Sequence, residues 1–240
     1  WGFPMRSCTV TVSGMIISPG RRYIFVHIPK TGGTAMATAL EARAHRDDIL
    51  IGDTPKAQKR RGRVAKLSAR GRLWKHAMLG DIDGVLSPEE IAAMFTVTLV
   101  RNPWDRMVSY YHWLRAQSFD HPAVPLAAEL SFGAFLAHPQ TVASLRAAPY
   151  GHYMRDVTGQ ERASLFIRLE HLEQDMAPFV AHLGFRPEIA RINASERARD
   201  YRGYYDDATA ERVARLCAED IARFGYRFDD VADSGPAPHR

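Results

Sequence analysis

A lysine, two threonines and two glycines cluster where an apolar stretch ends near the N-terminus. Residues 23–28 are largely apolar, and the cluster that follows them is Pro29, Lys30, Thr31, Gly32, Gly33 and Thr34. The pattern predicts a buried strand, a glycine turn, and a helix whose unpaired first amides and positive dipole end face an anion. The lysine adds a positive charge, the glycines let the backbone approach a ligand, and the threonines offer hydroxyl donors. We therefore expect an anion-binding turn here.

A second candidate anion site follows the β-branched stretch 96–100. Arg101 ends this stretch, Asn102 and Pro103 are suited to cap and begin a helix, and Ser109 comes eight residues after the arginine. A guanidinium donates two parallel hydrogen bonds to a phosphate, and a serine hydroxyl adds a third. A strand-end arginine alone is more often an ion-pair partner, so the site depends on the two motifs acting together.

The order of residues in the first motif separates it from the common nucleotide-binding loop. In GxxxxGK[ST] the lysine follows the glycines, whereas Lys30 precedes them. Residues 27–34 instead resemble the 5′-phosphosulfate loop of sulfotransferases that use 3′-phosphoadenosine 5′-phosphosulfate (PAPS), in the form found in the carbohydrate, family 2-like branch. Arg101 and Ser109 stand at the spacing of that family's 3′-phosphate pair.

The resemblance implies a set of roles. PAPS would be the co-substrate and adenosine 3′,5′-bisphosphate (PAP) the product, with no metal required. Lys30 would act at the leaving group, the Thr31 to Thr34 segment would hold the 5′-phosphate, and Arg101 with Ser109 would hold the 3′-phosphate. The similarity extends over residues 20–228, although members often carry a glutamine near residues 150–153, where this chain has none.

A hydroxyl acceptor needs a general base, and histidine suits that task at neutral pH. His76 is similar in placement to the histidine that family members use to activate acceptors, and we favour it. The alternatives are His27, His112, Asp105 and Glu170. Further candidates for phosphate, acceptor or nucleotide contacts are Arg106, Arg168, Arg199, Tyr201 and Arg202.

The order of elements predicts one α/β domain over residues 1–240, with a core at 20–228 and a frayed tail at 229–240. We expect a P-loop-like three-layer fold, in which helices flank a central, mainly parallel sheet and ligands gather at the carboxyl ends of its strands. The predicted strands are 23–28, 49–52 and 96–101, with 8–18 as an edge strand or hairpin arm, and the resemblance implies a further strand at 165–170. The predicted helices are 34–44, 88–95, 104–117, 131–138, 141–147, 171–183 and 208–224.

The chain is basic, with a net charge of +5. Residues 55–75 carry nine lysines and arginines and no acidic residue. Such a segment steers an anionic acceptor or the phosphates of a cofactor, and it is equally consistent with a solvated helix face. The sequence lacks the usual nucleic-acid-binding signatures, so we predict no nucleic-acid partner.

Cys8 and Cys217 lie far apart with no ligand spacing around them, so the sequence predicts no metal site, and Cys217 is expected in the core. No apolar stretch reaches the roughly 18 residues of a membrane span. We expect a cytoplasmic enzyme, or alternatively the lumenal catalytic domain of a Golgi enzyme whose anchor has been removed.

The sequence thus predicts a sulfotransferase that moves a sulfuryl group by in-line displacement to a hydroxyl of a carbohydrate-like acceptor, which is possibly anionic. One alternative is a nucleotide-dependent kinase or other P-loop phosphoryl transferase, which needs a lysine after the glycines and a carboxylate for magnesium. Another is a binding protein that keeps the fold without catalysis, against which the presence of Lys30, Arg101 and Ser109 argues.

Overall fold

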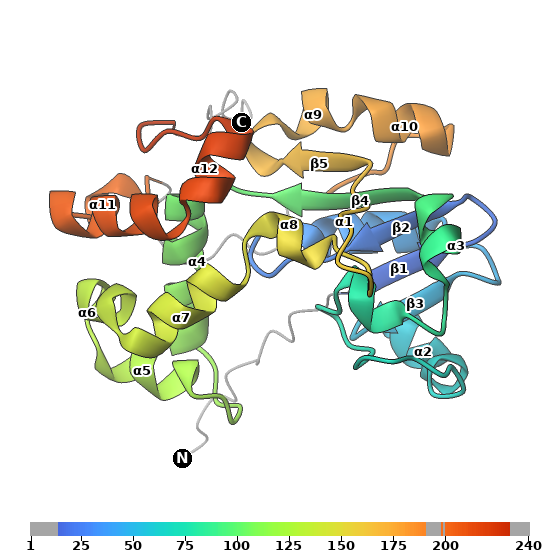
Figure 1. Ribbon diagram of the computed structural model, residues 1–240, viewed down its shortest axis with the longest axis horizontal. Helices are drawn as coiled ribbons and strands as arrows, with labels where there is room; N and C mark the ends of the chain where they lie inside the picture. The colour runs from blue at the N-terminus through green and yellow to red at the C-terminus, as the bar shows by residue number, and fades with distance from the viewer. Residues whose placement is uncertain (1–13, 191–197, 199, 231–240) are drawn as a thin grey trace, which may run out of the picture.

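The computed structural model describes residues 14–190, 198 and 200–230. A five-stranded sheet in the order β3-β1-β2-β4-β5 forms its centre (Figure 1). The strands are β1 Gly14–Ser18, β2 Tyr23–Val26, β3 Ile49–Gly52, β4 Phe95–Val100 and β5 Leu165–Arg168. β2, β4 and β5 are parallel, whereas β1 runs antiparallel to both of its neighbours. The sheet is mainly parallel, as predicted, with one reversed strand.

The position of β1 corrects one sequence-based prediction. Residues 8–18 were expected to form an edge strand or a hairpin arm, and residues 8–13 of this stretch lie outside the described residues. β1 is the first arm of a hairpin with β2, but it lies inside the sheet because β3 pairs with its other side. All five of its residues are buried, which fits an internal strand covered on both faces.

Helices occupy most of the remaining chain. Their bounds are α1 Gly33–Ala42, α2 Pro55–Val64, α3 Pro88–Ala92, α4 Pro103–Arg115, α5 Ala123–Glu129, α6 Phe132–Ala137, α7 Pro139–Ala147, α8 Tyr150–Tyr153, α9 Leu172–Asp175, α10 Ala177–Leu183, α11 Asp207–Leu216 and α12 Ala218–Phe224. Ser87 and Ser131 cap α3 and α6 through their hydroxyl oxygens. Gly184 and Gly225 end α10 and α12 in the left-handed conformation, which glycine adopts at little cost.

Two predicted long helices are divided in the structure. The stretch 171–183 contains α9 and α10, and Pro178 lies in the first turn of the second helix. Proline lacks the amide that would continue the hydrogen bonding of α9, so a new helix begins there. The stretch 208–224 divides at Cys217 into α11 and α12. Cys217 is buried in the core, as predicted.

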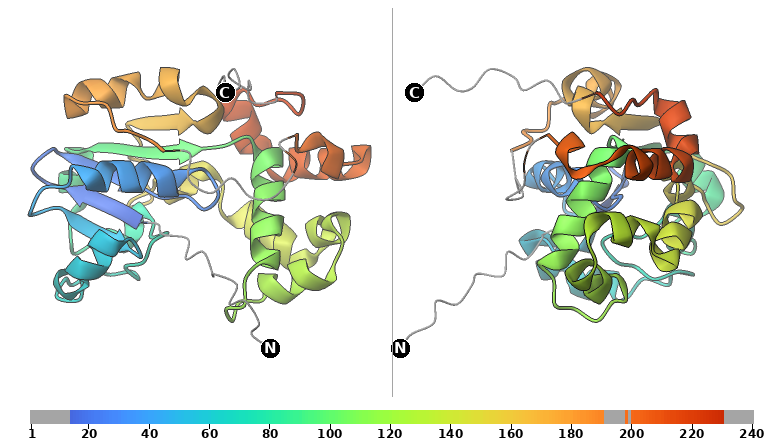
Figure 2. Two further views of the ribbon diagram at one scale, coloured as in Figure 1. Left: turned by 180° about the vertical axis from the view of Figure 1, so that it is seen from behind. Right: turned by 90° about the vertical axis from the view of Figure 1, so that its left-hand side faces the viewer.

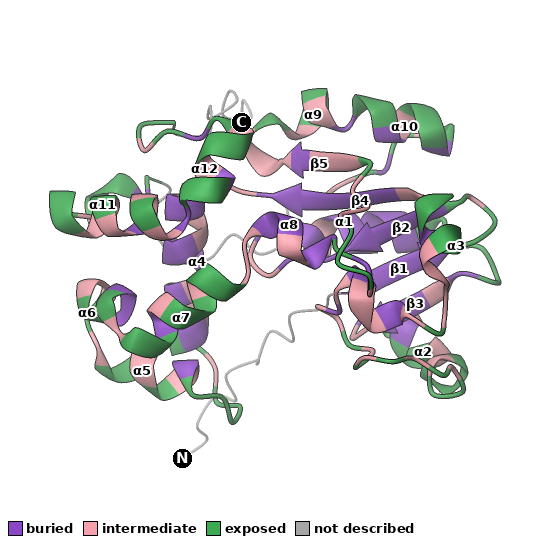
Figure 3. Ribbon diagram, in the orientation of Figure 1, coloured by how far each residue is buried: buried purple, intermediate pink, exposed green. Residues whose placement is uncertain are grey.

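Helices cover both faces of the sheet. On one face, a cluster of apolar side chains from the strands packs against α1 and α10. In the rear view, α1 lies in front of the sheet and α10 lies above β5 (Figure 2). Nearly all the residues of β1, β2 and β4 are buried (Figure 3). α4 to α7 and α11 lie beyond the carboxyl ends of β4 and β5 (Figure 1). The loops that leave the parallel strands therefore enter the space where sheet and helices meet.

Candidate active site

The two predicted anion-binding loops lie side by side. β2 and β4 are parallel neighbours, and the Thr98 hydroxyl donates a 2.7 Å hydrogen bond to the Val26 carbonyl. Just beyond these strand ends, Nη1 of Arg101 donates to the carbonyl oxygen of Lys30 at 3.2 Å. One ligand with two anionic groups can therefore contact both loops at once.

The glycine turn has an unusual backbone that brings amides close to a ligand. Lys30 and Gly32 both adopt positive φ angles, of 68° and 87°. A Cβ at Gly33 would lie 2.1 Å from Cδ2 of His27, so only glycine fits against that buried imidazole. The Thr31 hydroxyl donates to the Ile28 carbonyl at 2.8 Å and is fully buried. In this structure, that hydroxyl stabilises the turn, where the sequence had suggested a ligand donor.

α1 follows the turn with its first amides facing the same loop. Gly32 occupies the cap position, and no side chain among the described residues accepts a capping hydrogen bond there. A helix N-terminus of this kind offers amide donors and a partial positive charge to an anion. The ammonium group of Lys30 lies 5.3 Å from the centre of the Trp113 ring, a cation–π contact with α4.

Arg101 is oriented by a carboxylate on the next helical turn. Its Nε and Nη2 donate to Oδ2 of Asp105 at 2.8 and 2.6 Å. Both side chains are largely buried, so this pair fixes the direction of the guanidinium group. Ser109 is also buried, on α4. The pairing of Asp105 with Arg101 gives it a structural role and does not favour it as a base.

Arg106 and Tyr150 join the two loops, a function that the sequence did not predict. Nε of Arg106 donates to the Pro29 carbonyl at 3.0 Å, and its guanidinium stacks 4.9 Å from the Tyr150 ring. The Tyr150 hydroxyl donates to the Arg101 carbonyl at 2.5 Å. The sequence does show Arg106 five residues after Arg101, but no local pattern identifies Tyr150 as its partner.

Residues that follow β5 support the same region. Glu170 accepts a 2.7 Å hydrogen bond from the Asn102 amide, and its burial raises the pKa of the carboxyl group. Arg168 forms a 2.7 Å ion pair with Asp175. Because this pair occupies the guanidinium group, Arg168 is not favoured as a ligand contact. The Tyr201 hydroxyl accepts from the side-chain amide of Asn102 at 3.2 Å. These contacts hold the loop after β4 in position.

The remaining candidates are Arg202 and Arg199 near the C-terminus and His112 on α4. Arg202 is exposed and pairs with Asp200 at 2.7 Å. Arg199 lies outside the described residues. His112, on α4, packs edge-on against the ring of Tyr204, with the ring centres 5.0 Å apart.

His76 lies against the strand that delivers the glycine turn. Its Nδ1 is 3.0 Å from the carbonyl oxygen of His27. A carbonyl only accepts hydrogen bonds, so Nδ1 carries the proton and Nε2 carries the lone pair. Burial lowers the pKa of His76 to about 4, although the bond to His27 opposes this. The ring is therefore neutral at pH 7, with Nε2 able to accept a proton.

His27 is buried between the His76 ring and the glycine turn. Its ring is 3% exposed, and its centre is 4.8 Å from the centre of the His76 ring. Burial lowers the pKa of His27 well below its usual range, and the nearby His76 adds to the effect. A neutral, buried ring that packs against Gly33 forms the floor of the glycine turn.

A hollow of about 330 Å³ opens along α1, from Ala35 to Arg43. Its walls include Ala35, Ala39, Phe185 and Pro187. Arg43, Arg186 and Glu188 also line it, so the wall combines apolar and charged side chains. The hollow is large enough for a flat aromatic base.

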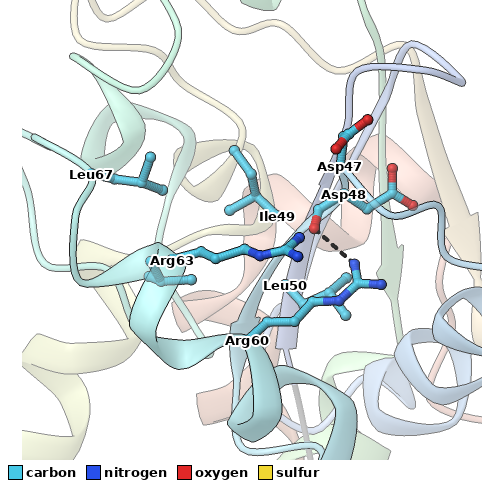
Figure 4. Close-up of a pocket in the computed structure, with 8 residues that line it drawn as sticks. Asp47, Asp48, Ile49, Leu50, Arg60, Arg63 and Leu67 are labelled. Carbon is cyan, nitrogen blue, oxygen red and sulfur yellow. Dashed lines mark hydrogen bonds between the residues drawn. The ribbon is translucent and has the colours of Figure 1, made fainter.

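Some charged residues of the basic segment 55–75 attach α2 to the rest of the protein, and others are exposed. Figure 4 shows Arg60 of α2 directed at the chain before β3, where its Nη1 donates to the Asp48 carbonyl at 3.0 Å. Arg63 donates in the same way to the Arg46 carbonyl at 2.6 Å. These charges attach α2 to the turn after α1. Part of the basic pattern is therefore structural, while Lys59 and Arg61 are exposed.

Comparison with known proteins identifies the family. The model described as "Sulfotransferase family" matches residues 13–227. The chain belongs to the sulfotransferase family. The fold of this sulfotransferase is similar to that of mouse sulfotransferase SULT7A1, solved in complex with PAP, over 89% of this chain and 88% of the other, with a TM-score of 0.50 and 19% identity. No curated protein sequence matches it. The prediction that the chain is a PAPS-dependent sulfotransferase is thus confirmed at the level of the family.

The described part of the sulfotransferase has neither a membrane-spanning helix nor a metal-binding cluster. None of its helices combines the length and apolar character needed to cross a membrane. Among the same residues, no group of three or more His, Cys, Asp or Glu side chains is arranged to hold a metal ion.

Proposed function

We propose that this sulfotransferase transfers a sulfuryl group from PAPS to a hydroxyl group of a carbohydrate-like acceptor. The observation that supports this most strongly is the 3.2 Å hydrogen bond from Arg101 to the Lys30 carbonyl. It brings the two anion-binding motifs within the span of one doubly phosphorylated nucleotide. The similar mouse sulfotransferase was solved with PAP, the product that such a donor leaves.

The donor would bind across both loops. The amides of Gly32, Gly33 and Thr34 would hold the 5′-phosphate at the start of α1, as helix N-termini do with anions. Arg101 and Ser109 would bind the 3′-phosphate, with Asp105 fixing the guanidinium direction. The apolar part of the hollow beside α1, formed by Ala35, Ala39 and Phe185, would take the adenine ring.

The transfer step requires a base on one side of sulfur and a positive charge on the other. A new S–O bond forms to the acceptor oxygen while the S–O bond to the 5′-phosphate breaks, and the acceptor proton passes to Nε2 of His76. The phosphate leaves with the bonding electron pair, and the Lys30 ammonium stabilises the negative charge that develops on it. Positioning and charge stabilisation account for most of the catalysis in this scheme, by analogy with phosphoryl transfer.

Ligand-dependent stability tests the donor assignment. PAP without metal is expected to raise the unfolding temperature, with about 2.7 kcal/mol of stabilisation at 100 times its dissociation constant. Stabilisation by ATP with magnesium and not by PAP would contradict the proposal and support the phosphoryl-transfer alternative.

Lys30→Ala tests the catalytic role of the ammonium group. We expect transfer from labelled PAPS to fall by at least 100-fold, because the leaving phosphate loses its nearest cation. Lys59→Ala is a charge-matched control on the exposed face of α2 and should leave transfer unchanged. Normal transfer by the Lys30→Ala variant would rule out this catalytic role of the ammonium group.

A panel of neutral and acidic glycans, offered with labelled donor, identifies the acceptor.

A further inference from the structure

Trp74 is exposed beside the proposed base. Among the described residues, Trp74 and Phe119 are the large hydrophobic side chains with high exposure, at 41% and 45%. The centre of the Trp74 ring is 5.2 Å from that of His76, at an angle of 87°. An indole surface in water is unfavourable, and its position next to the group that would activate the acceptor suggests a ligand that covers it.

A positive charge accompanies this indole. The Arg72 guanidinium lies 5.5 Å from the centre of the Trp74 ring and is exposed. Lys75, its neighbour along the chain, forms an ion pair with Asp53 at 2.9 Å. No carboxylate of the described residues forms such a pair with Arg72, so its charge is available to an anionic ligand.

The segment that carries these side chains is fixed although it is neither helix nor strand. The amides of Arg70 and Gly71 donate to the Asp83 and Asp81 carbonyls at 2.7 and 3.0 Å. A Cβ at Gly71 would lie 2.2 Å from Oδ1 of Asp81, so the close approach requires glycine. The other end is attached through the bond between His76 and His27. Residues 72–74, which we name the acceptor ledge, are thus held in place before a ligand arrives.

We propose that the acceptor ledge binds the acceptor as an acidic sugar. One apolar face of a sugar ring packs on the Trp74 indole, and a carboxylate or sulfate of that sugar pairs with Arg72. This arrangement places a sugar hydroxyl near Nε2 of His76. The inference rests on the proposed function, because it assigns the acceptor of that same reaction. In this proposal Arg72 recognises the acceptor, whereas Arg60 and Arg63 attach α2 to the rest of the protein.

Calorimetric titration of the PAP-saturated protein tests the ledge. The probes are a glucuronic-acid-containing hexasaccharide and a neutral glucose hexasaccharide. The unaltered protein should bind the acidic probe more tightly, and Trp74→Ala should weaken that binding at least 10-fold. Trp74→Phe, which keeps an aromatic face, should stay within about 3-fold of the unaltered protein. Arg72→Ala should remove the preference for the acidic probe.

Two matched variants control for general surface effects. Phe119→Ala removes an aromatic ring of similar exposure that contacts Trp113, and Lys59→Ala removes an exposed charge on α2. Both should bind the acidic probe normally, and an equal loss in either would overturn the ledge. Retained binding by Trp74→Ala, or no binding of the acidic probe by the unaltered protein, would also overturn it. If PAP fails to bind, the proposed function fails instead, so the two failures are distinguishable.

Discussion

The surroundings of His76 determine how the enzyme should respond to pH. Because burial lowers the pKa of His76 to about 4, the deprotonated base persists well below neutrality. We therefore expect the turnover number to show no loss from this group between pH 8 and 6, and to fall as the pH decreases toward 4. A pH–rate profile at saturating PAPS measures this. A half-maximal rate at pH 6.5, the ordinary histidine value, would contradict it.

Replacement of the base tests the same residue by chemistry. His76→Gln keeps a polar side chain but cannot accept the acceptor proton. General-base catalysis typically contributes 10²- to 10⁴-fold, so turnover should fall by at least about 100-fold. PAP affinity should not change, since His76 is assigned to the acceptor side. An equal turnover in the variant would remove His76 as the base.

Gly33 is a sensitive position for donor binding. In Gly33→Ala the added Cβ would overlap the His27 ring, so the turn or the imidazole must move. We expect PAP affinity, measured by calorimetry, to fall at least 10-fold. Gly62→Ala is the control, because a Cβ there meets no atom within 4 Å. It should leave PAP affinity unchanged and raise helix stability by about 0.5–1 kcal/mol. Equal PAP affinities in the two variants would contradict the close fit at Gly33.

Individual site residues differ in how far the sequence could predict them. Lys30, Gly33 and Arg101 belong to short motifs, so the strand–turn–helix pattern and the resemblance to the family's loops were enough to propose them. The bond of Tyr150 to Arg101 joins residues 49 positions apart. The contact of His76 with His27 likewise spans 49 positions. Such pairings depend on tertiary packing, and no local pattern encodes them.

At the level of elements, α8 supports the loop that follows β4. Tyr150→Phe removes the hydroxyl that donates to the Arg101 carbonyl and leaves the ring under Arg106. The loss of a hydrogen bond of about 1–1.5 kcal/mol should weaken PAP binding about 5- to 10-fold, measured by calorimetry. Tyr153→Phe, on the same helix, is the control and should bind PAP normally. Equal affinities in all three proteins would show that α8 does not support the loop.

The elements themselves were predictable where side chains act locally. The strand at 49–52 was predicted at its observed bounds, and the caps at Ser87 and Ser131 formed as expected. The internal position of β1 was not predictable, because strand order depends on which neighbours bury each edge. The short helix α8 also lacked a signal, since one helical turn is too short to show a hydrophobic period.

At the scale of the whole molecule, a buried carboxylate connects the C-terminal helices to the site. Asp220 of α12 is 4% exposed and accepts a 2.9 Å hydrogen bond from the Tyr150 amide. Burial raises the pKa of Asp220 to about 6, above the value near 4 of an unfolded chain. A raised folded-state pKa stabilises the protein at low pH, and this stabilisation is lost as the pH rises through about 6.

Asp220→Asn tests this linkage. Between about pH 4 and pH 6 the free energy of unfolding of the unaltered protein should fall, relative to that of the variant, by up to about 1.4 kcal/mol per pH unit. Urea unfolding at several pH values measures the difference, in which contributions from other titrating groups cancel. If the difference in unfolding free energy between the two proteins does not vary with pH, the Asp220 carboxyl group titrates alike in the folded and unfolded states.

The reversed strand β1 has a consequence for how the enzyme acquires its shape during synthesis. β1 and β2 pair residues up to nine positions apart, such as Ile16 with Phe25. β4 and β5 pair residues 68 positions apart, such as Val97 with Leu165. Near contacts form sooner than distant ones. On the ribosome, we therefore expect the hairpin to form while most of the polypeptide is still unmade, and to serve as the template on which the later strands assemble.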